Sequence, residues 1–192
     1  MTKSNNAPLS LLIPCKNEET NIEKCIKSVD WIDEKFMVDS QSTDKTIDIA
    51  EKLGATVVQF EYKGGWPKKK NWALENLPFS HEWVLILDAD ECLPPEAEEE
   101  IREIVSNRNE KHSGYWINRR YFFLGKPLKH AYFPNWNLRL FKHKLGRYEK
   151  ITELNTDSGD NEIHEHVVVK GTTGRLTSIM DHYSFPTIDS FI

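Results

Sequence analysis

Residues 82–96 read EWVLILDADECLPPE, and this stretch places carboxylates directly after an apolar run. Trp83–Leu87 is short and continuously apolar, as expected of a strand that is buried on both faces in a parallel sheet. The run stops at Asp88, and Asp90 and Glu91 follow within three residues. These acids predict either caps for the next helix or ligands at the edge of the sheet.

Strand and helix patterns alternate on both sides of this stretch. The expected elements are strands at 9–14, 35–40, 55–60 and 83–87, and helices at 20–29, 42–54, 66–77 and 94–107. Such alternation predicts an α/β fold, with a mostly parallel central sheet and helices on both faces. Ligands of such sheets bind beyond the carboxyl ends of the strands, so the polar residues that follow each strand are the candidate site.

Local signals refine the helix starts. Thr20 and Glu23 have the spacing of a capping box. Ser42 or Asp44 is expected to cap the second helix, and Pro67 is expected in the first turn of the third.

The second half has a different composition. Segments 114–123 and 135–143 are aromatic-rich and predict strands, and 164–171 and 174–185 predict further strand segments. The sequence contains no internal repeat. We therefore expect a single domain over residues 1–192, with a donor-binding half at about 9–110 and an acceptor-side half at about 111–192.

Composition limits the function classes. The chain has 192 residues, 39% of them hydrophobic and 29% charged, which is typical of a soluble globular domain. A net charge of −5 gives no indication of nucleic-acid binding, and no apolar run is long enough for a membrane helix or a signal peptide. Cys15, Cys25 and Cys92 form no C-x-x-C pair and are expected to be buried thiols. We expect a cytoplasmic protein.

The acids after the fourth strand favour a hard cation. In extended backbone, residues i and i+2 point the same way, so Asp88 and Asp90 would face one ion together. Carboxylate oxygens suit Mn²⁺ or Mg²⁺, with substrate phosphates completing the coordination. The alternative is that Asp88 caps the strand end and that Asp90 or Glu91 caps the helix that starts at Pro94.

Lysines 68–70 lie at the N-terminal end of the expected third helix. Their positive charge opposes the helix dipole, and a phosphate partner would explain this placement. The alternative is a solvated helix start.

Several motifs carry a family resemblance. LSLLIPCKNEETNIEKCIKSV, VDSQSTDKTIDIA, GGWPKKKNWAL and VLILDADE resemble, in order and spacing, family-2 glycosyltransferases with the GT-A fold. GYWINRRYFFLGKPLKH, WNLRLFK, IHEHV and DHYSF resemble the lipopolysaccharide-core, WaaE/KdtX-like branch. The resemblance covers the chain from about Leu9 to its C-terminus.

The resemblance implies a hexosyltransferase-type enzyme. Such an enzyme moves a sugar with inversion from a nucleotide diphosphate, with UDP as the expected nucleotide, to a glycan such as lipopolysaccharide core. The donor-binding residues implied by the family motifs, with Ser42 added from the same loop, are Pro14, Asn17, Glu18, Asp39, Ser42, Lys70, Asn71 and Asp88. The metal ligands implied are Asp88 and Asp90. Ser40 departs from the glycine that the wider family often has after Asp39.

Inversion by direct displacement needs one general base. Glu165 matches the glutamate of the HE pair in the resembling branch and is the predicted base; the alternative is a salt bridge or an acceptor contact. Asp181 is the second candidate for the base. His182 is a candidate metal ligand, and Arg119, Arg120 and Arg139 are candidates for an anionic acceptor or the diphosphate.

Two other function classes remain open. A nucleotidyltransferase also uses an α/β domain with paired acids, but PCKNEE lacks the glycines of a phosphate loop. A non-catalytic module that binds a nucleotide-sugar or glycan would keep Asp39, Asp88 and Asp90 and tolerate loss of Glu165. Relatives of the resembling branch continue with amphipathic helices, so we expect a C-terminally truncated chain or a short relative. A lipid-linked acceptor would demand peripheral contact with the inner membrane face.

Overall fold

The computed structural model describes residues 7–150 and 166–185. The helices are α1 (Ile22–Ser28), α2 (Thr46–Lys52), α3 (Lys69–Asn76) and α4 (Glu96–Ser106). The strands are β1 (Leu9–Cys15), β2 (Glu34–Asp39), β3 (Thr56–Gln59), β4 (Trp83–Ile86), β5 (Glu91–Cys92), β6 (His112–Phe123), β7 (Lys126–Pro127), β8 (Trp136–Lys142), β9 (Gly146–Tyr148), β10 (Val167–Val169) and β11 (Thr172–Phe185). Across these ranges, none of the helices has the length and apolar character needed to span a membrane.

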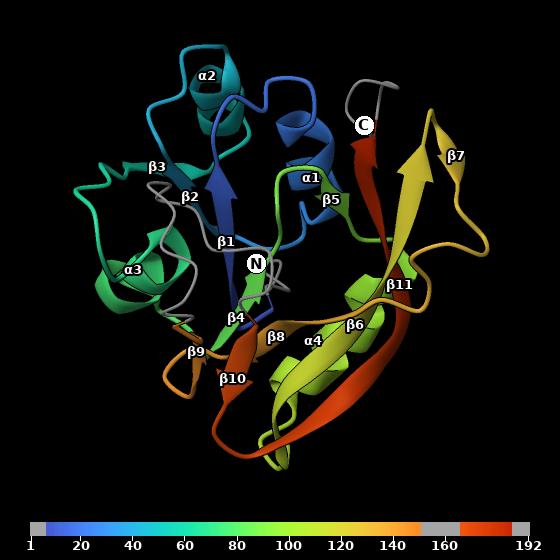
Figure 1. Ribbon diagram of the computed structural model, residues 1–192. Coiled ribbons are helices and arrows are strands. Elements are labelled where there is room, and N and C mark those ends of the chain that lie inside the picture. Colours follow the sequence, from blue (N-terminus) through green and yellow to red (C-terminus); the bar gives the residue numbers. More distant parts are fainter. Residues whose placement is uncertain (1–6, 151–165, 186–192) are drawn as a thin grey trace, which may run out of the picture.

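One large sheet organises the described residues (Figure 1). Its order is β3-β2-β1-β4-β8-β6-β11-β5, with β7 paired to β6, and β9 and β10 form a separate two-stranded sheet. Strands β1 to β4 pair in parallel, β8 is antiparallel to both neighbours, and β6 and β11 are parallel to each other. The predicted α/β fold is confirmed, and the antiparallel β8 joins the two parallel parts.

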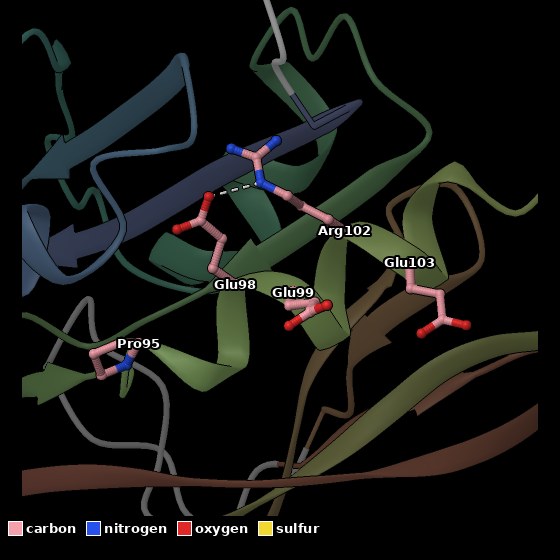
Figure 2. Close-up of a pocket in the computed structure, with 5 residues that line it drawn as sticks. All are labelled: Pro95, Glu98, Glu99, Arg102 and Glu103. Atoms are coloured by element: carbon pink, nitrogen blue, oxygen red, sulfur yellow. Dashed lines mark hydrogen bonds and ion pairs between the residues drawn. The ribbon is translucent and has the colours of Figure 1, made fainter.

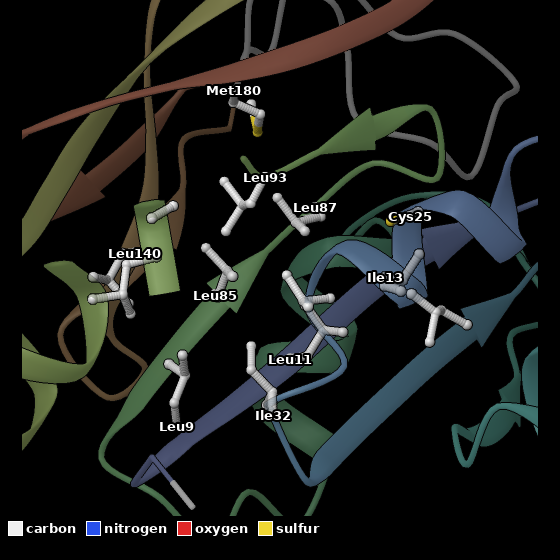
Figure 3. Packing of buried hydrophobic residues seen from close by; sticks show 14 of the residues in the cluster. Leu9, Leu11, Ile13, Cys25, Ile32, Leu85, Leu87, Leu93, Leu140 and Met180 are labelled. Atoms are coloured by element: carbon white, nitrogen blue, oxygen red, sulfur yellow. The ribbon is translucent and has the colours of Figure 1, made fainter. Parts of the chain in front are cut away.

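Helices cover both faces of the parallel part. Side chains on one face of β1, such as Leu11 and Ile13, share a buried cluster with residues of α1, α2 and α4. Figure 3 shows Leu11 and Ile13 close to Cys25 of α1. On the other face, Leu12 packs with α3 through Ala73 and Leu74. The predicted stripe of α1, which includes Ile22, Cys25, Ile26 and Val29, is fully buried. Burial of each such apolar side chain contributes about 2 kcal/mol to the stability of this arrangement.

Two predicted helix starts are wrong in detail. No side-chain cap bonds the N-terminus of α1, and Glu23 instead pairs with Lys27 on the exposed surface at 2.6 Å. The capping box does not form because Asn21, and not Thr20, is the N-cap residue, which puts Glu23 at the second helical position instead of the third. Pro67 precedes α3 rather than lying in its first turn.

The second helix is closer to its prediction. Asp44 accepts a hydrogen bond from the backbone N–H of Thr46 at 3.0 Å, so Asp44 rather than Ser42 supports the start of α2. Gly54 follows the helix with φ +80°, the left-handed conformation that favours glycine at a helix end.

The carboxyl ends of the parallel strands meet at one edge, as predicted. Cys15 of β1 lies beside Asp39 of β2, and Asp39 lies beside Gln59 of β3. The N–H of Leu87, just after β4, donates to the carbonyl of Leu12 at 3.1 Å. The strand β11 reaches the same edge, since His182 is in register with Glu91 of β5.

Candidate active site

The acids after β4 form a turn. The backbone N–H of Glu91 donates to the carbonyl of Asp88 at 2.9 Å, so residues 88–90 form a turn that leads into β5 at Glu91 and are not extended. The expectation that Asp88 and Asp90 point the same way because they lie in a strand is therefore wrong. Asp88 faces Lys70 and Arg139, whereas Asp90 faces β11.

Asp88 lies between two cations. Lys70 Nζ is 2.8 Å from its Oδ1, and Arg139 Nη2 is 2.6 Å from its Oδ2. Burial alone would raise the pKa of Asp88, but Arg139 and Lys70 outweigh it and hold this pKa well below its usual range. Asp88 is therefore ionised at neutral pH and holds both cations at the edge of the sheet.

Glu91 is a residue whose role the sequence interpretation missed. Its side chain is fully buried, and Oε1 accepts hydrogen bonds from Arg139 at 2.5 Å and Arg119 at 3.0 Å. Oε2 accepts the backbone N–H of Asp88 at 2.9 Å. No side chain caps α4, so the alternative that Asp90 or Glu91 caps this helix is wrong. The sequence shows only that Glu91 lies close to the predicted site. Its burial against two arginines depends on tertiary packing and could not be predicted.

Asp90 connects the turn to β11. Its Oδ2 lies 2.9 Å from Nε2 of His182, and its carbonyl accepts the N–H of Tyr183 at 2.9 Å. The hydroxyl of Ser184 is also within hydrogen-bond distance of the His182 ring, 3.0 Å from Nδ1. The fold thus brings together Asp90 and His182, which the sequence analysis named as candidate ligands of one metal ion.

The loops after β1 and β2 bind each other. Asp39 is fully buried, and its carboxylate accepts hydrogen bonds from the N–H and the hydroxyl of Ser42 and from Gln59 at 3.0 Å. Asn17, at φ 54°, donates its N–H to the Ser42 hydroxyl at 2.8 Å and accepts from Thr43 N–H at 2.8 Å. Hydrogen bonds between the two loops therefore hold the predicted donor-binding residues together, with Pro14 half-buried in β1 beside them.

Nearby acids affect the pKa of Glu18 at this edge. Burial, together with the charges of Asp90, Asp44 and Asp88, raises the pKa of Glu18. Acids from three separate loops therefore act on one another at this edge, and a bound cation would relieve their repulsion.

At the start of α3, Lys68 and Lys69 are buried and Lys70 is half-buried, so these lysines do not form the solvated helix start. Lys68 is 5% and Lys69 2% exposed, and Lys69 Nζ donates to the carbonyl of Cys15 at 3.1 Å. Asn71 is buried too, and its amide pairs with the backbone N–H and carbonyl of Tyr148, each at 2.9 Å. Of the predicted basic–Asn pair, Lys70 reaches Asp88, while Asn71 fastens α3 to β9.

The arginines pair with specific acids. Arg119 contacts Glu91 and donates to the Tyr121 hydroxyl at 2.6 Å. Arg120 binds Oδ1 of Asp181 through two nitrogens, at 2.8 and 2.6 Å. Asp181 therefore already has a cationic partner. Glu165, the first candidate for the base, lies outside the described residues.

Two buried polar atoms near Asp88 lack protein partners. Among the described residues, Nε of Arg139 and the hydroxyl of Tyr148 are buried without a hydrogen-bond partner. The Tyr148 ring lies 5.3 Å from Lys70 Nζ. A buried donor without a partner is costly, so an anionic oxygen bound here would satisfy groups that the protein leaves unpaired.

The donor chemistry fits a divalent cation, but the described side chains alone do not enclose one. Asp88, Asp90 and His182 provide carboxylate oxygens and an imidazole, which suit Mn²⁺ or Mg²⁺ together with phosphate oxygens. Within the described ranges, no group of three or more His, Cys, Asp or Glu side chains is arranged around a single ion position. Phosphate oxygens of a substrate would have to complete the coordination.

The cavities of the molecule differ in charge. A cavity of about 560 Å³ on α4 is lined by Pro95, Glu98, Glu99, Arg102 and Glu103 (Figure 2). Its lining is mainly acidic and would repel a diphosphate. A second cavity, of about 400 Å³, lies beside the end of β3 and has an aromatic lining that includes Phe60, Tyr62, Trp66 and Trp72. Phe60 N–H donates to the Asp39 carbonyl at 2.8 Å, so this aromatic cavity borders the Asp39 loop.

Known proteins that this chain resembles include several glycosyltransferases. The family model for Glycosyl transferase family 2 matches residues 10–161. An uncharacterised glycosyltransferase of Rickettsia conorii is 35% identical over 196 residues, covering 100% of this chain and 68% of the relative. The lipopolysaccharide core biosynthesis glycosyltransferase LpsC of Rhizobium meliloti is 31% identical over 176 residues, covering 87% of this chain and 59% of LpsC. The chain thus spans roughly three fifths to two thirds of the length of these relatives.

A solved structure supports the fold. The crystal structure of S. aureus TarS 1-349 matches with a TM-score of 0.50 and 22% identity, over 70% of this chain and 47% of that chain. Together with the family match, this similarity confirms the GT-A fold predicted from the resemblance.

Proposed function

The chain belongs to glycosyl transferase family 2, and from its site we propose that it transfers a sugar, with inversion, from a nucleotide-diphosphate donor to a glycan acceptor. We propose UDP as the nucleotide and lipopolysaccharide core or a similar glycan as the acceptor. LpsC, at 31% identity, supports the acceptor class. A lipid-linked acceptor would bring the protein to the inner face of the membrane.

One observation carries the proposal. At the carboxyl edge of the sheet, Lys70 and Arg139 converge on Asp88, and Arg139 keeps a buried N–H without a partner in the described residues. A diphosphate has two to three negative charges and gains more as the sugar leaves. Cations held in place before the reaction stabilise that charge without reorganisation.

We assign a separate role to each of three groups of residues at this edge. Asp39 and Ser42, with Pro14, Asn17 and Glu18 beside them, would bind the nucleoside. Lys70, Arg139 and Arg119 would stabilise the departing diphosphate and orient an anionic acceptor. Asp88, Asp90 and His182 would hold Mn²⁺ or Mg²⁺, which when bound would neutralise charge on the leaving oxygen.

The acceptor hydroxyl needs a base on the other side of the sugar. We propose Glu165 for this role. Asp181 is the second candidate, and its Oδ1 is occupied by Arg120. Direct displacement requires no enzyme nucleophile, and the buried cysteines are poor candidates for one, since burial raises the pKa of Cys15 to about 12.

Calorimetric titration tests the donor site. UDP and UDP-sugars are titrated into wild type and Asp90→Asn with and without Mn²⁺, and Asp48→Asn on the exposed side of α2 is the control. Wild type and control should bind UDP more tightly with Mn²⁺, and Asp90→Asn should lose that gain. Equal Mn²⁺ dependence in wild type and Asp90→Asn would remove Asp90 from the metal site.

Glu165→Gln separates an enzyme from a binding module. Transfer to the glycan should collapse in this variant while UDP and Mn²⁺ binding persist, because a base acts on the acceptor and not on the donor. Unchanged transfer would exclude Glu165 as the base.

A further inference from the structure

Exposed apolar side chains gather in one short segment of the second half of the chain. In the described residues, the exposed large hydrophobic side chains are Leu124 (48% exposed), Tyr132 (56%), Phe133 (38%) and Val168 (59%). Three of these four lie within residues 124–134, which contain β7 and the chain after it at the rim of the molecule (Figure 1). We call residues 124–134 the tip. Clustered exposed apolar side chains, unlike scattered ones, mark interaction sites.

The charged residues in this part of the sequence are all basic. No Asp or Glu occurs between Lys111 and Tyr148, in a chain whose net charge is −5. Within the tip, Lys126, Lys129 and His130 are exposed. Exposed aromatic and aliphatic side chains beside lysines are the combination that binds the interface of an anionic bilayer.

The backbone conformation of the tip disfavours the large apolar residues that it carries. The turn between β6 and β7 has φ 47° at Leu124 and φ 74° at Gly125, and Tyr132 has φ 58°. Two-residue hairpin turns with positive φ at both positions favour Asn-Gly, and the left-handed region disfavours leucine and tyrosine. Apolar side chains thus stay exposed at positions where the backbone favours small polar residues.

The tip is joined to the candidate site by aromatic contacts. The Tyr132 ring centroid lies 5.3 Å from that of Tyr121, and Tyr121 lies 4.7 Å from the His182 ring. Tyr121 also accepts a hydrogen bond from Arg119 at 2.6 Å. A surface that binds at the tip would therefore lie close to His182 and, through it, to Asp90.

We propose that the tip docks onto an anionic lipid bilayer, with Leu124, Tyr132 and Phe133 entering the headgroup region and Lys126 and Lys129 contacting lipid phosphates. Docking presents the site to an acceptor anchored in that bilayer; this purpose rests on the proposed function, whereas the binding itself does not. The positive charge favours this occupant over a second copy of the chain, since two identical basic tips would repel each other.

Vesicle flotation tests the apolar part. Wild type is mixed with vesicles of phosphatidylglycerol and phosphatidylethanolamine, or of phosphatidylcholine alone. Wild type should float with the anionic vesicles, and Leu124→Ser/Tyr132→Ser/Phe133→Ser should partition about tenfold more weakly. Val168→Ser is the control, because Val168 on β10 is as exposed as Tyr132 and lies at the opposite end of the molecule (Figure 1).

A second pair of variants tests the charge. Lys126→Gln/Lys129→Gln should weaken binding to anionic vesicles about tenfold, and added salt should weaken wild type in the same direction. The control Lys144→Gln/Lys170→Gln removes two exposed lysines near β9 and β10. Far-ultraviolet circular dichroism checks that each variant is folded.

The outcomes are separate from those of donor binding. If both tip variants lose binding to anionic vesicles and both control variants keep it, docking is supported, whether or not UDP binds. Absence of wild-type flotation, or equal loss in tip and control variants, overturns it. Concentration-dependent dimerisation that the triple serine variant abolishes, without flotation of wild type, also overturns it and assigns the tip to a second copy.

Discussion

Replacement of Glu91 by glutamine tests whether the buried carboxylate holds the site together. The side chain is fully buried and faces Arg139 at 2.5 Å and Arg119 at 3.0 Å. Glutamine keeps the shape and removes the charge. Its amide can place an oxygen toward the arginines or toward the N–H of Asp88, but not toward both.

The expected loss follows from which cation remains unpaired. Removal of one partner of a buried ion pair costs about 3–5 kcal/mol, because the other charge stays buried. Arg139 keeps Asp88 at 2.6 Å, so the loss falls mainly on Arg119, whose side chain is 14% exposed and reaches some water. We therefore expect the lower end of that range, a decrease of about 3 kcal/mol in the free energy of unfolding.

Urea denaturation, followed by circular dichroism, measures this loss. With a slope of about 2 kcal/mol per molar urea, the midpoint should fall by about 1.5 M. Glu98→Gln is the matched control, because Glu98 pairs with Arg102 at 2.8 Å on the surface of α4 and should lose less than about 1 kcal/mol. Adding Arg119→Met to Glu91→Gln should recover part of the loss. If Glu91→Gln loses no more stability than Glu98→Gln, the reasoning from burial and charge is refuted.

Three further predictions concern stability. Burial opposes ionisation of Glu100, but hydrogen bonds from β11, including one from Ser178 N–H at 3.1 Å, lower the pKa of Glu100 below the ordinary 4.5. The ionised side chain should therefore add about 1 kcal/mol to the free energy of unfolding above pH 4.5, and this contribution should decline as the pH falls below that value. In urea titrations at acidic pH, the unfolding free energies of Glu100→Gln and wild type should converge. Leu124→Asn should raise the free energy of unfolding by about 1 kcal/mol, because asparagine tolerates φ 47°, while weakening vesicle flotation; an unchanged or lower stability would contradict the account of the turn. Gly146→Ala should lower the melting temperature and cost about 2 kcal/mol, since a Cβ there would lie 2.6 Å from Cε2 of the buried Phe141 ring, and a neutral result would show that the ring can move.

Local periodicity explains why much of the fold was predictable. Ile22, Cys25, Ile26 and Val29 follow helical spacing, and all four are fully buried. The apolar run 83–87 became the buried β4 and the residue after it, as its composition indicated. Helix ends were less predictable, because capping depends on backbone geometry at one or two residues, as the failed capping box at Glu23 shows.

The amino-acid sequence by itself determined the α/β order, the family, and the polar loops at the carboxyl edge, because these depend on patterns that are local in the chain. Only the tertiary structure decided which charges meet there. Asp90 lies against His182 across 92 residues, and Glu91 binds arginines 28 and 48 residues away. Such pairings depend on how β6, β8 and β11 align beside β4 and β5, and residue spacing along the chain carries no information about that alignment.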